Sequence, residues 1–171
     1  LELQTDHNEI AKNLTERCGL SEKVIHICGD ILKHNFNEKK FDIIVSWLAL
    51  FHIKEHKSLL QKCYDLMSQD GIFYAEDLIS IQSLNDGEKY EMSTELYVKY
   101  LPDYQTYKSE LKKNGYKLIA SQNMTDEWIN FTRKRKLSYD RQRNRNIRVH
   151  GNSIVKSLGS FYTFIDRYFS S

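Results

Sequence analysis

The sequence predicts a doubly wound α/β fold built on a mostly parallel sheet. Short β-branched runs alternate with amphipathic helical patterns along the first half of the chain. One run, Phe41–Leu48, is continuously apolar at its centre, as in a strand buried on both faces of a parallel sheet. The length of 171 residues suits a single domain, residues 1–171. Within it we expect a sheet core at 1–80, a helical insertion at 81–115, and an edge strand with C-terminal helices at 116–171.

The first elements expected are a helix and a strand. Asp6, with Glu9 three residues later, forms a capping-box pattern ahead of apolar residues at helical spacing, which predicts a helix over Asp6–Cys18. The short β-branched run at Lys23–Cys28 predicts a strand.

Periodicity then places the remaining elements. After the strand Phe41–Leu48, a one-sided apolar stripe predicts a helix over His56–Met67, and Asp70-Gly71 predicts a turn. A further strand follows at Ile72–Ile79. The second half is expected to hold helices and one strand, at Asn85–Tyr100, Asp103–Asn114, Tyr116–Met124 (the strand), Thr125–Tyr139 and Val155–Phe169.

Composition narrows the class of protein. The three cysteines form no CxxC pair, which argues against a disulfide framework or a metal site and predicts a reducing, cytoplasmic location. No apolar run reaches the roughly 18 residues of a transmembrane helix, and no secretory leader is visible, so no membrane association is expected.

One segment is strongly basic. Arg133–Arg148 holds eight Lys/Arg and one acid, Asp140, which leaves about five negative charges on the rest of a chain with net charge +2. Two interpretations stay open, a solvated helix face and a binding surface for a protein partner. Aromatic residues are missing from Arg141–Arg148, which argues against stacking on single-stranded nucleic acid.

Polar side chains follow several of the expected strands. In open α/β sheets, ligands bind at the carboxyl ends of the strands. Carboxylates near two successive strand ends suit a nucleoside, because one accepts from ribose hydroxyls and the other from an adenine amino group. The residues delivered there are Glu2, Gln4, Asp30, Ile31, Ser46, Trp47, His52, Glu76 and Asp77.

The segments VIHICGDIL, FDIIVSWLALFHI and LLQKCYDLMSQDGIFYAEDL, in this order and spacing, resemble the class I S-adenosylmethionine-dependent methyltransferases. The resemblance is closest to small-molecule N-methyltransferases acting on phosphoethanolamine, sarcosine or related amines, and it runs from Leu1 to about Phe131. It implies a Rossmann-like fold, S-adenosylmethionine as cofactor and a small-molecule amine as substrate.

The resemblance also implies roles for particular residues. Glu2, with Gln4 nearby, matches the acid that holds the cofactor ribose, and Asp30 matches the acid that meets the adenine amino group. The other matched positions are Ile31 beside the base, Ser46 and Trp47 along the cofactor, and His52 as the catalytic residue that positions or deprotonates the substrate.

Each role has a structural alternative. Glu2 is otherwise a solvated acid, Asp30 a turn residue, and His52 a helix cap or a core histidine. Glu76 and Asp77 either line the site or only charge a loop. Four tyrosines are either a cage for a cationic amine or packing residues: Tyr97, Tyr100, Tyr104 and Tyr107.

The sequence departs from this family in two respects. No G-x-G is present, and the resemblance begins at the family's second strand. We therefore expect that residues 1–171 do not fold alone as an open sheet, and that upstream sequence or another chain supplies the missing strands. Leu48 stands where phosphoethanolamine enzymes have an acid, which argues against phosphoethanolamine as the substrate. A carboxylated amine such as glycine or sarcosine, and no substrate at all, both stay open.

Three hypotheses follow. The first is an N-methyltransferase for a small amine. The second is a catalytically inactive module with the same fold, acting as a structural or interaction subunit of a larger assembly. The third, a nucleic-acid methyltransferase, rests only on the basic segment and is disfavoured, because Pro102 is the single proline and no N-P-P-Y motif occurs.

Overall fold

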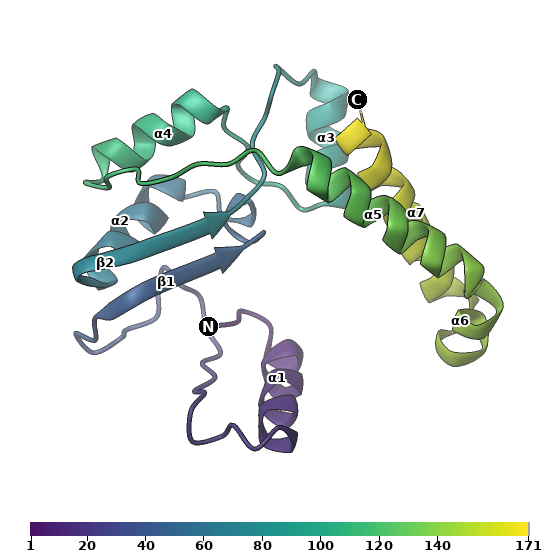
Figure 1. Ribbon diagram of the computed structural model, residues 1–171, viewed down its shortest axis with the longest axis horizontal. Coiled ribbons are helices and arrows are strands. Elements are labelled where there is room, and N and C mark those ends of the chain that lie inside the picture. The colour runs from purple at the N-terminus through teal and green to yellow at the C-terminus, as the bar shows by residue number, and fades with distance from the viewer. Residues whose placement is uncertain (171) are drawn as a thin grey trace. The chain divides into compact units, whose positions relative to one another are not determined.

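The computed structural model describes the backbone of residues 1–170 and the side chains of residues 1–168, so Ser171 of the expected domain lies outside the described residues. The chain divides into two compact units. The first, here called the sheet unit, comprises Leu1–Leu84 and Val98–Lys117. The second, the helical unit, comprises Asn85–Tyr97 and the residues from Leu118 onward (Figure 1).

The sheet unit is built on two parallel strands. Their ladder runs from the Ile43–Ile72 pair to the Trp47–Glu76 pair, and a helix connects the two strands. This parallel pair with a helical crossover confirms the α/β class and is the described part of a Rossmann-like sheet. The elements are α1 (Thr5–Arg17), β1 (Phe41–Trp47), the 3₁₀ turn η1 (Leu50–His52), α2 (His56–Leu66), β2 (Met67–Glu76) and α4 (Tyr104–Lys113).

The core of the sheet unit lies on one face of β1 and β2. The predicted apolar stripe of α2 supplies Leu59 and Cys63, which cluster with Leu50 and pack against Ile44 and Phe73 of the strands. Leu60, also on α2, is fully buried. These contacts explain why the sequence folds α2 onto this face, since burial of such side chains is the main stabilising contribution.

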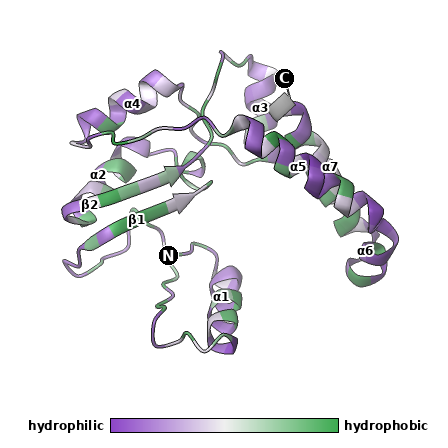
Figure 2. Ribbon diagram, in the orientation of Figure 1, coloured by the Kyte–Doolittle hydropathy of each residue, from purple (hydrophilic) through white to green (hydrophobic). Residues whose placement is uncertain are grey.

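The opposite face of β1 and β2 is exposed, because side chains alternate along a strand. Trp47 is 69% exposed and Ile43 61%, and the paired residues Ile72 and Tyr74 are about half exposed. The prediction that Phe41–Leu48 is buried on both faces is therefore wrong for this chain. Figure 2 shows both strands as largely hydrophobic ribbons.

The predicted turn at Asp70-Gly71 lies inside β2 rather than before it. Asp70 has a φ of 62°, in the left-handed region, and the ladder shifts register between Phe41 and Ile43. At Gly71 a Cβ would lie 3.0 Å from the Ser68 carbonyl oxygen, so a side chain there would crowd the backbone. The strand starts earlier than predicted because β2 pairs with β1 before this irregularity, at Met67 with Phe41, and again after it, from Ile72 with Ile43.

Two predictions near the N-terminus change in detail. The helix forms as α1, but its N-cap is Gln4 and no side chain caps it, so the predicted Asp6–Glu9 capping box is absent there. Lys23–Cys28 forms no strand; it contributes a single parallel bridge between Cys28 and Glu2. A strand needs a hydrogen-bonded neighbour along its length, and the Glu2 stub is too short to provide one.

The helical unit contains the rest of the chain. It comprises α3 (Asp86–Glu95), α5 (Thr125–Arg141), α6 (Arg143–His150) and α7 (Asn152–Ser170). Val155 and Phe164 of α7 are buried, and the Tyr139 and Tyr162 rings of α5 and α7 lie 5.5 Å apart. The predicted strand at Tyr116–Met124 is not formed, since its backbone has no ladder partner in the part of the chain described.

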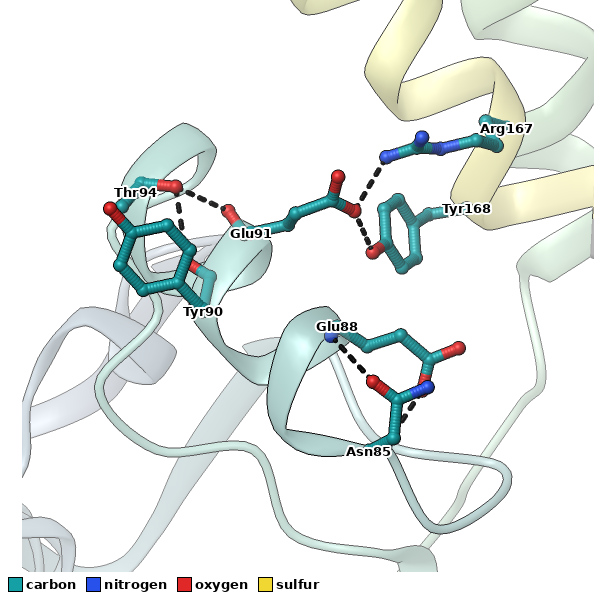
Figure 3. Close-up of polar contacts among 7 residues, drawn as sticks. All are labelled: Asn85, Glu88, Tyr90, Glu91, Thr94, Arg167 and Tyr168. Atoms are coloured by element: carbon teal, nitrogen blue, oxygen red, sulfur yellow. Dashed lines mark hydrogen bonds and ion pairs between the residues drawn. The ribbon is translucent and has the colours of Figure 1, made fainter.

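Polar contacts hold α3 against α7 within the helical unit (Figure 3). Asn85 and Glu88 form a reciprocal capping box at the start of α3. Glu91 accepts from the Arg167 guanidinium at 2.7 Å and from the Tyr168 hydroxyl. These contacts are part-exposed, so each contributes modestly to stability.

The described residues form neither a membrane-spanning helix nor a cluster of metal ligands. Within them, no helix has the length and apolar character needed to cross a membrane. Nor, among the side chains that the structure describes, do three or more His, Cys, Asp or Glu residues gather as they would around a metal ion.

Candidate functional site

The structure pairs the backbone at Glu2 with the segment that precedes Asp30, so two of the predicted acidic residues lie on adjacent segments. Glu2 donates its amide to Ile27 and accepts from the Gly29 amide at 2.8 Å, which makes the parallel bridge to Cys28. Cys28 lies two residues before Asp30, so the bridge sets Glu2 beside the segment that leads to Asp30. Gln4 lies two residues after Glu2 and donates its amide to the Glu2 carboxylate at 2.8 Å.

The Asp30 carboxylate has a structural function that the sequence left open. One oxygen accepts from the Leu32 amide at 2.9 Å, and the other lies 3.6 Å from the Lys33 ammonium. Asp30 is therefore a turn residue in this structure. The carboxylate is still 34% exposed, and with about four acceptor sites it retains capacity for a further donor. Ile31 packs against the apolar core of the sheet unit.

Ser46 and Trp47 end β1 on opposite faces of the sheet. Ser46 pairs with Ala75 on the side that α2 covers, whereas Trp47 pairs with Glu76 on the exposed side. The structure thus separates two residues that the sequence grouped together. Of the two, only Trp47 presents a large aromatic surface, 69% exposed, to a ligand.

His52 lies in the 3₁₀ turn η1, just after β1. Its ring is exposed and lies 4.0 Å from the ring of Phe51, which is buried. His52 is therefore not the N-cap of α2, which is Glu55, and it does not lie in the core. An exposed imidazole on a short turn at the carboxyl end of a strand is accessible to a substrate.

Asp77 follows β2 and is directed into the protein. Its Oδ1 lies 3.4 Å from the Phe51 amide nitrogen, which donates to it. Burial raises the pKa of the Asp77 carboxyl to about 6, while the Leu78 and Phe51 amides oppose that shift. Asp77 thus contacts the turn that carries His52 instead of only charging a loop.

Two of the four tyrosines considered for a cation cage act as packing residues. Tyr100 and Tyr107 pack their rings against His56, at centroid distances of 4.6 and 5.2 Å, so these two are packing residues. Tyr104 is 38% exposed, and Tyr97 belongs to the helical unit.

Two residues of this region were not found from the sequence. His56 is buried, and its Nδ1 lies 3.0 Å from Glu110 Oε2. They are 54 positions apart, and no local pattern announces a contact of that range. The only sequence signal for this contact is that each residue lies on the inward-facing stripe of its helix.

The basic segment lies on α5 and α6 of the helical unit. Part of its charge is paired there, with Arg133 3.1 Å from Asp166 and Lys136 2.8 Å from Asp140. Arg135 lies over the Phe131 ring, 5.8 Å from its centroid.

Comparisons with known proteins show what the first part of the chain is similar to. Residues 1–75 match the family described as a methyltransferase domain. Among curated proteins, the phosphoethanolamine N-methyltransferase of Plasmodium falciparum is 27% identical over 123 residues, 71% of this chain and 46% of that protein. The chain therefore spans about half the length of this relative.

Solved structures extend the likeness to nearly the whole chain. A Haemonchus contortus phosphoethanolamine N-methyltransferase, bound to phosphomonomethylethanolamine and S-adenosylhomocysteine, has a TM-score of 0.85 at 18% identity and covers 99% of this chain. A Galdieria sulphuraria protein assigned as a sarcosine dimethylglycine methyltransferase has a TM-score of 0.83 at 12% identity and covers 98%. The chain covers 39% and 62% of these two proteins, respectively. At these identities the likeness shows the fold.

Proposed function

Because the chain carries a methyltransferase domain in residues 1–75 and has the class I methyltransferase fold, we propose that it belongs to an S-adenosylmethionine-dependent methyltransferase. The substrate we propose is a small amine, methylated on nitrogen. The N-methyltransferase relatives support this choice of reaction. The observation that supports the proposal most is the Glu2–Cys28 bridge, which pairs the backbone at Glu2 with the segment two residues before Asp30.

These residues fit the nucleoside end of the cofactor. Glu2 is proposed to accept from the ribose hydroxyls, and Asp30 from the adenine amino group through its remaining acceptor sites. Trp47 offers an exposed aromatic surface to the same ligand. We propose that the cofactor site is also lined by Gln4, Ile31 and Ser46. When bound, the cofactor supplies a methyl group activated by attachment to a sulfonium.

His52 is proposed to take the proton of the substrate ammonium, because only the neutral amine has a lone pair for the methyl carbon. Histidine is the side chain that most often exchanges protons near neutral pH. The turn η1 holds this ring at the carboxyl end of β1, where proximity would supply much of the rate.

The substrate class proposed is a carboxylated amine, such as glycine or sarcosine. In phosphoethanolamine enzymes, an acid at the position of Leu48 faces the ammonium group of the substrate. Leu48, which follows β1, provides no such charge. Its amide donates to the Glu76 carbonyl at 2.7 Å, so this position is held by the sheet. A protein partner of acidic character is proposed for the basic segment Arg133–Arg148, on charge complementarity alone.

The test is a calorimetric titration of S-adenosylhomocysteine into the native, full-length protein. We expect micromolar binding that is lost in Asp30→Ala and kept in Asp126→Ala, which removes an exposed acid of the helical unit. Radiolabelled methyl transfer to glycine, sarcosine and phosphoethanolamine then assigns the substrate. Absence of binding at millimolar ligand would refute the proposal and favour the inactive structural module.

A further inference from the structure

One carboxylate in the sheet unit joins two segments that flank the His52 turn. Glu110, on α4, accepts from the Tyr100 hydroxyl with Oε1, and its Oε2 lies 3.0 Å from His56 Nδ1. His56 is the first residue of α2 and follows His52 by four positions. Tyr100 belongs to the segment that precedes α4. The Glu110 side chain therefore links α4, α2 and this segment through two hydrogen bonds.

The histidine end of this link is shielded from water, whereas the Glu110 side chain is 25% exposed. The His56 side chain is 3% exposed, and the rings of Tyr100 and Tyr107 cover it. Burial lowers the pKa of His56, against the opposing effect of Glu110. The Tyr107 hydroxyl is buried without a hydrogen-bond partner among the described residues, and burial raises its pKa, with a smaller contribution from the Asp77 charge. In such surroundings a hydrogen bond to a carboxylate is worth more than at the surface.

The same segment also holds the His52 turn directly. The Phe51 carbonyl accepts from the Lys99 and Tyr100 amides at 2.8 and 3.1 Å, and the Phe51 amide donates to Asp77 at 3.4 Å. The Phe51 ring is 6% exposed. Phe51, the residue before His52, is thus held in place by its N–H, its carbonyl group and its buried side chain.

These contacts close a ring around His52. On one side, the Tyr100 amide reaches Phe51; on the other, the Tyr100 hydroxyl reaches Glu110, which reaches His56. Breaking the ring at Glu110 would remove this partner from the buried His56 ring and the part-buried Tyr100 hydroxyl, which is unfavourable enough to displace the segments that carry them.

We propose that Glu110 is a positioning residue, which sets the place of the His52 ring through Tyr100 on one side and His56 on the other. The inference rests on the proposed role of His52 as the proton acceptor. It extends that role by naming the residues, distant in sequence, that hold it. A purely stabilising role for the same cluster is the alternative that the test must separate.

The variants are Glu110→Met, which keeps the length of the side chain without acceptor oxygens, and Tyr100→Phe, which removes one hydroxyl. Tyr64→Phe is the matched control, since Tyr64 lies on α2 of the same unit, is 40% exposed and stands outside the cluster. Amide hydrogen exchange of the native, full-length protein is followed over the Leu50–His52 turn. We expect both variants to speed exchange there about tenfold or more, the effect of losing a hydrogen bond to a charged group, with β1–β2 amides unchanged.

The second readout is methyl transfer to glycine, sarcosine and phosphoethanolamine. We expect kcat to fall in both variants while the KM for S-adenosylmethionine stays at its wild-type value, and Tyr64→Phe to keep both. Unchanged exchange at the turn would overturn the inference. So would faster exchange with an unchanged kcat, because the cluster would then only stabilise the fold. A wild-type protein inactive on all three amines would count against the proposed function, while the exchange result still decides the positioning.

Discussion

Replacing Asp77 with Asn tests whether the acid at the end of β2 is buried as the structure has it. Burial raises the pKa of this carboxyl from 3.8 to about 6. A difference of about two pKa units corresponds to ~3 kcal/mol, as an upper bound. Because the carboxyl is only part-buried, we expect Asp77→Asn to raise the free energy of unfolding by about 1–3 kcal/mol at pH 7. The amide keeps an acceptor oxygen for the Phe51 N–H.

The sign of the pH dependence follows from proton linkage. Below about pH 4 the carboxyl is protonated in the folded and unfolded states alike, so wild type and variant should be equally stable. Between about pH 4 and 6 the folded protein holds a proton that the unfolded chain has lost, so wild-type stability falls as pH rises. Above about pH 6 the full difference between the two proteins is present.

The assay is urea unfolding of the native, full-length wild type, Asp77→Asn and Glu9→Gln across pH 4 to 8. Glu9 is an exposed residue of α1, so its variant reports the change of net charge. The quantity compared is the difference in free energy of unfolding between variant and wild type at each pH. A difference for Asp77→Asn that stays flat with pH, or that favours wild type at pH 7, would refute the reasoning.

Three further predictions concern stability, each measured by chemical denaturation. Leu60→Ala should lower the free energy of unfolding by about 2–5 kcal/mol, because Leu60 is fully buried and the truncation leaves a cavity. Gly115→Ala should cost about 1–3 kcal/mol, since Gly115 has a φ of +89° and an added Cβ would lie 2.8 Å from the Tyr64 ring; a neutral result would mean that the ring moves away freely. Glu91→Gln should cost less than about 1 kcal/mol, because the ion pair with Arg167 is half exposed. That small loss should vanish at high salt.

The elements with strong local patterns were predicted well from the sequence. The α2 helix lies within one residue of its prediction, because its apolar stripe is the face that packs on the strands. Helix α4 was also predicted closely, and Asp103 caps it by accepting from the Thr106 amide at 2.9 Å. In both helices the sequence signal and the tertiary contact coincide.

Strands were predicted less well, because a strand exists only if another strand accepts its hydrogen bonds. Lys23–Cys28 and Tyr116–Met124 have the β-branched composition of strands, yet the first forms one bridge and the second none in the described chain. The exposed face of β1 has the same origin. Its composition predicts burial, but in this chain only one face has a helix to cover it.

By itself, the sequence determined the α/β class, the strand at Phe41–Trp47 with helix α2 after it, and helix α4. Each of these follows from residues close together in the chain. Only the tertiary structure decided that Lys23–Cys28 forms a single bridge and that Glu110 reaches His56, 54 positions away. Contacts of that range depend on how helices and loops pack over the sheet, and side-chain type along a single segment does not encode that packing.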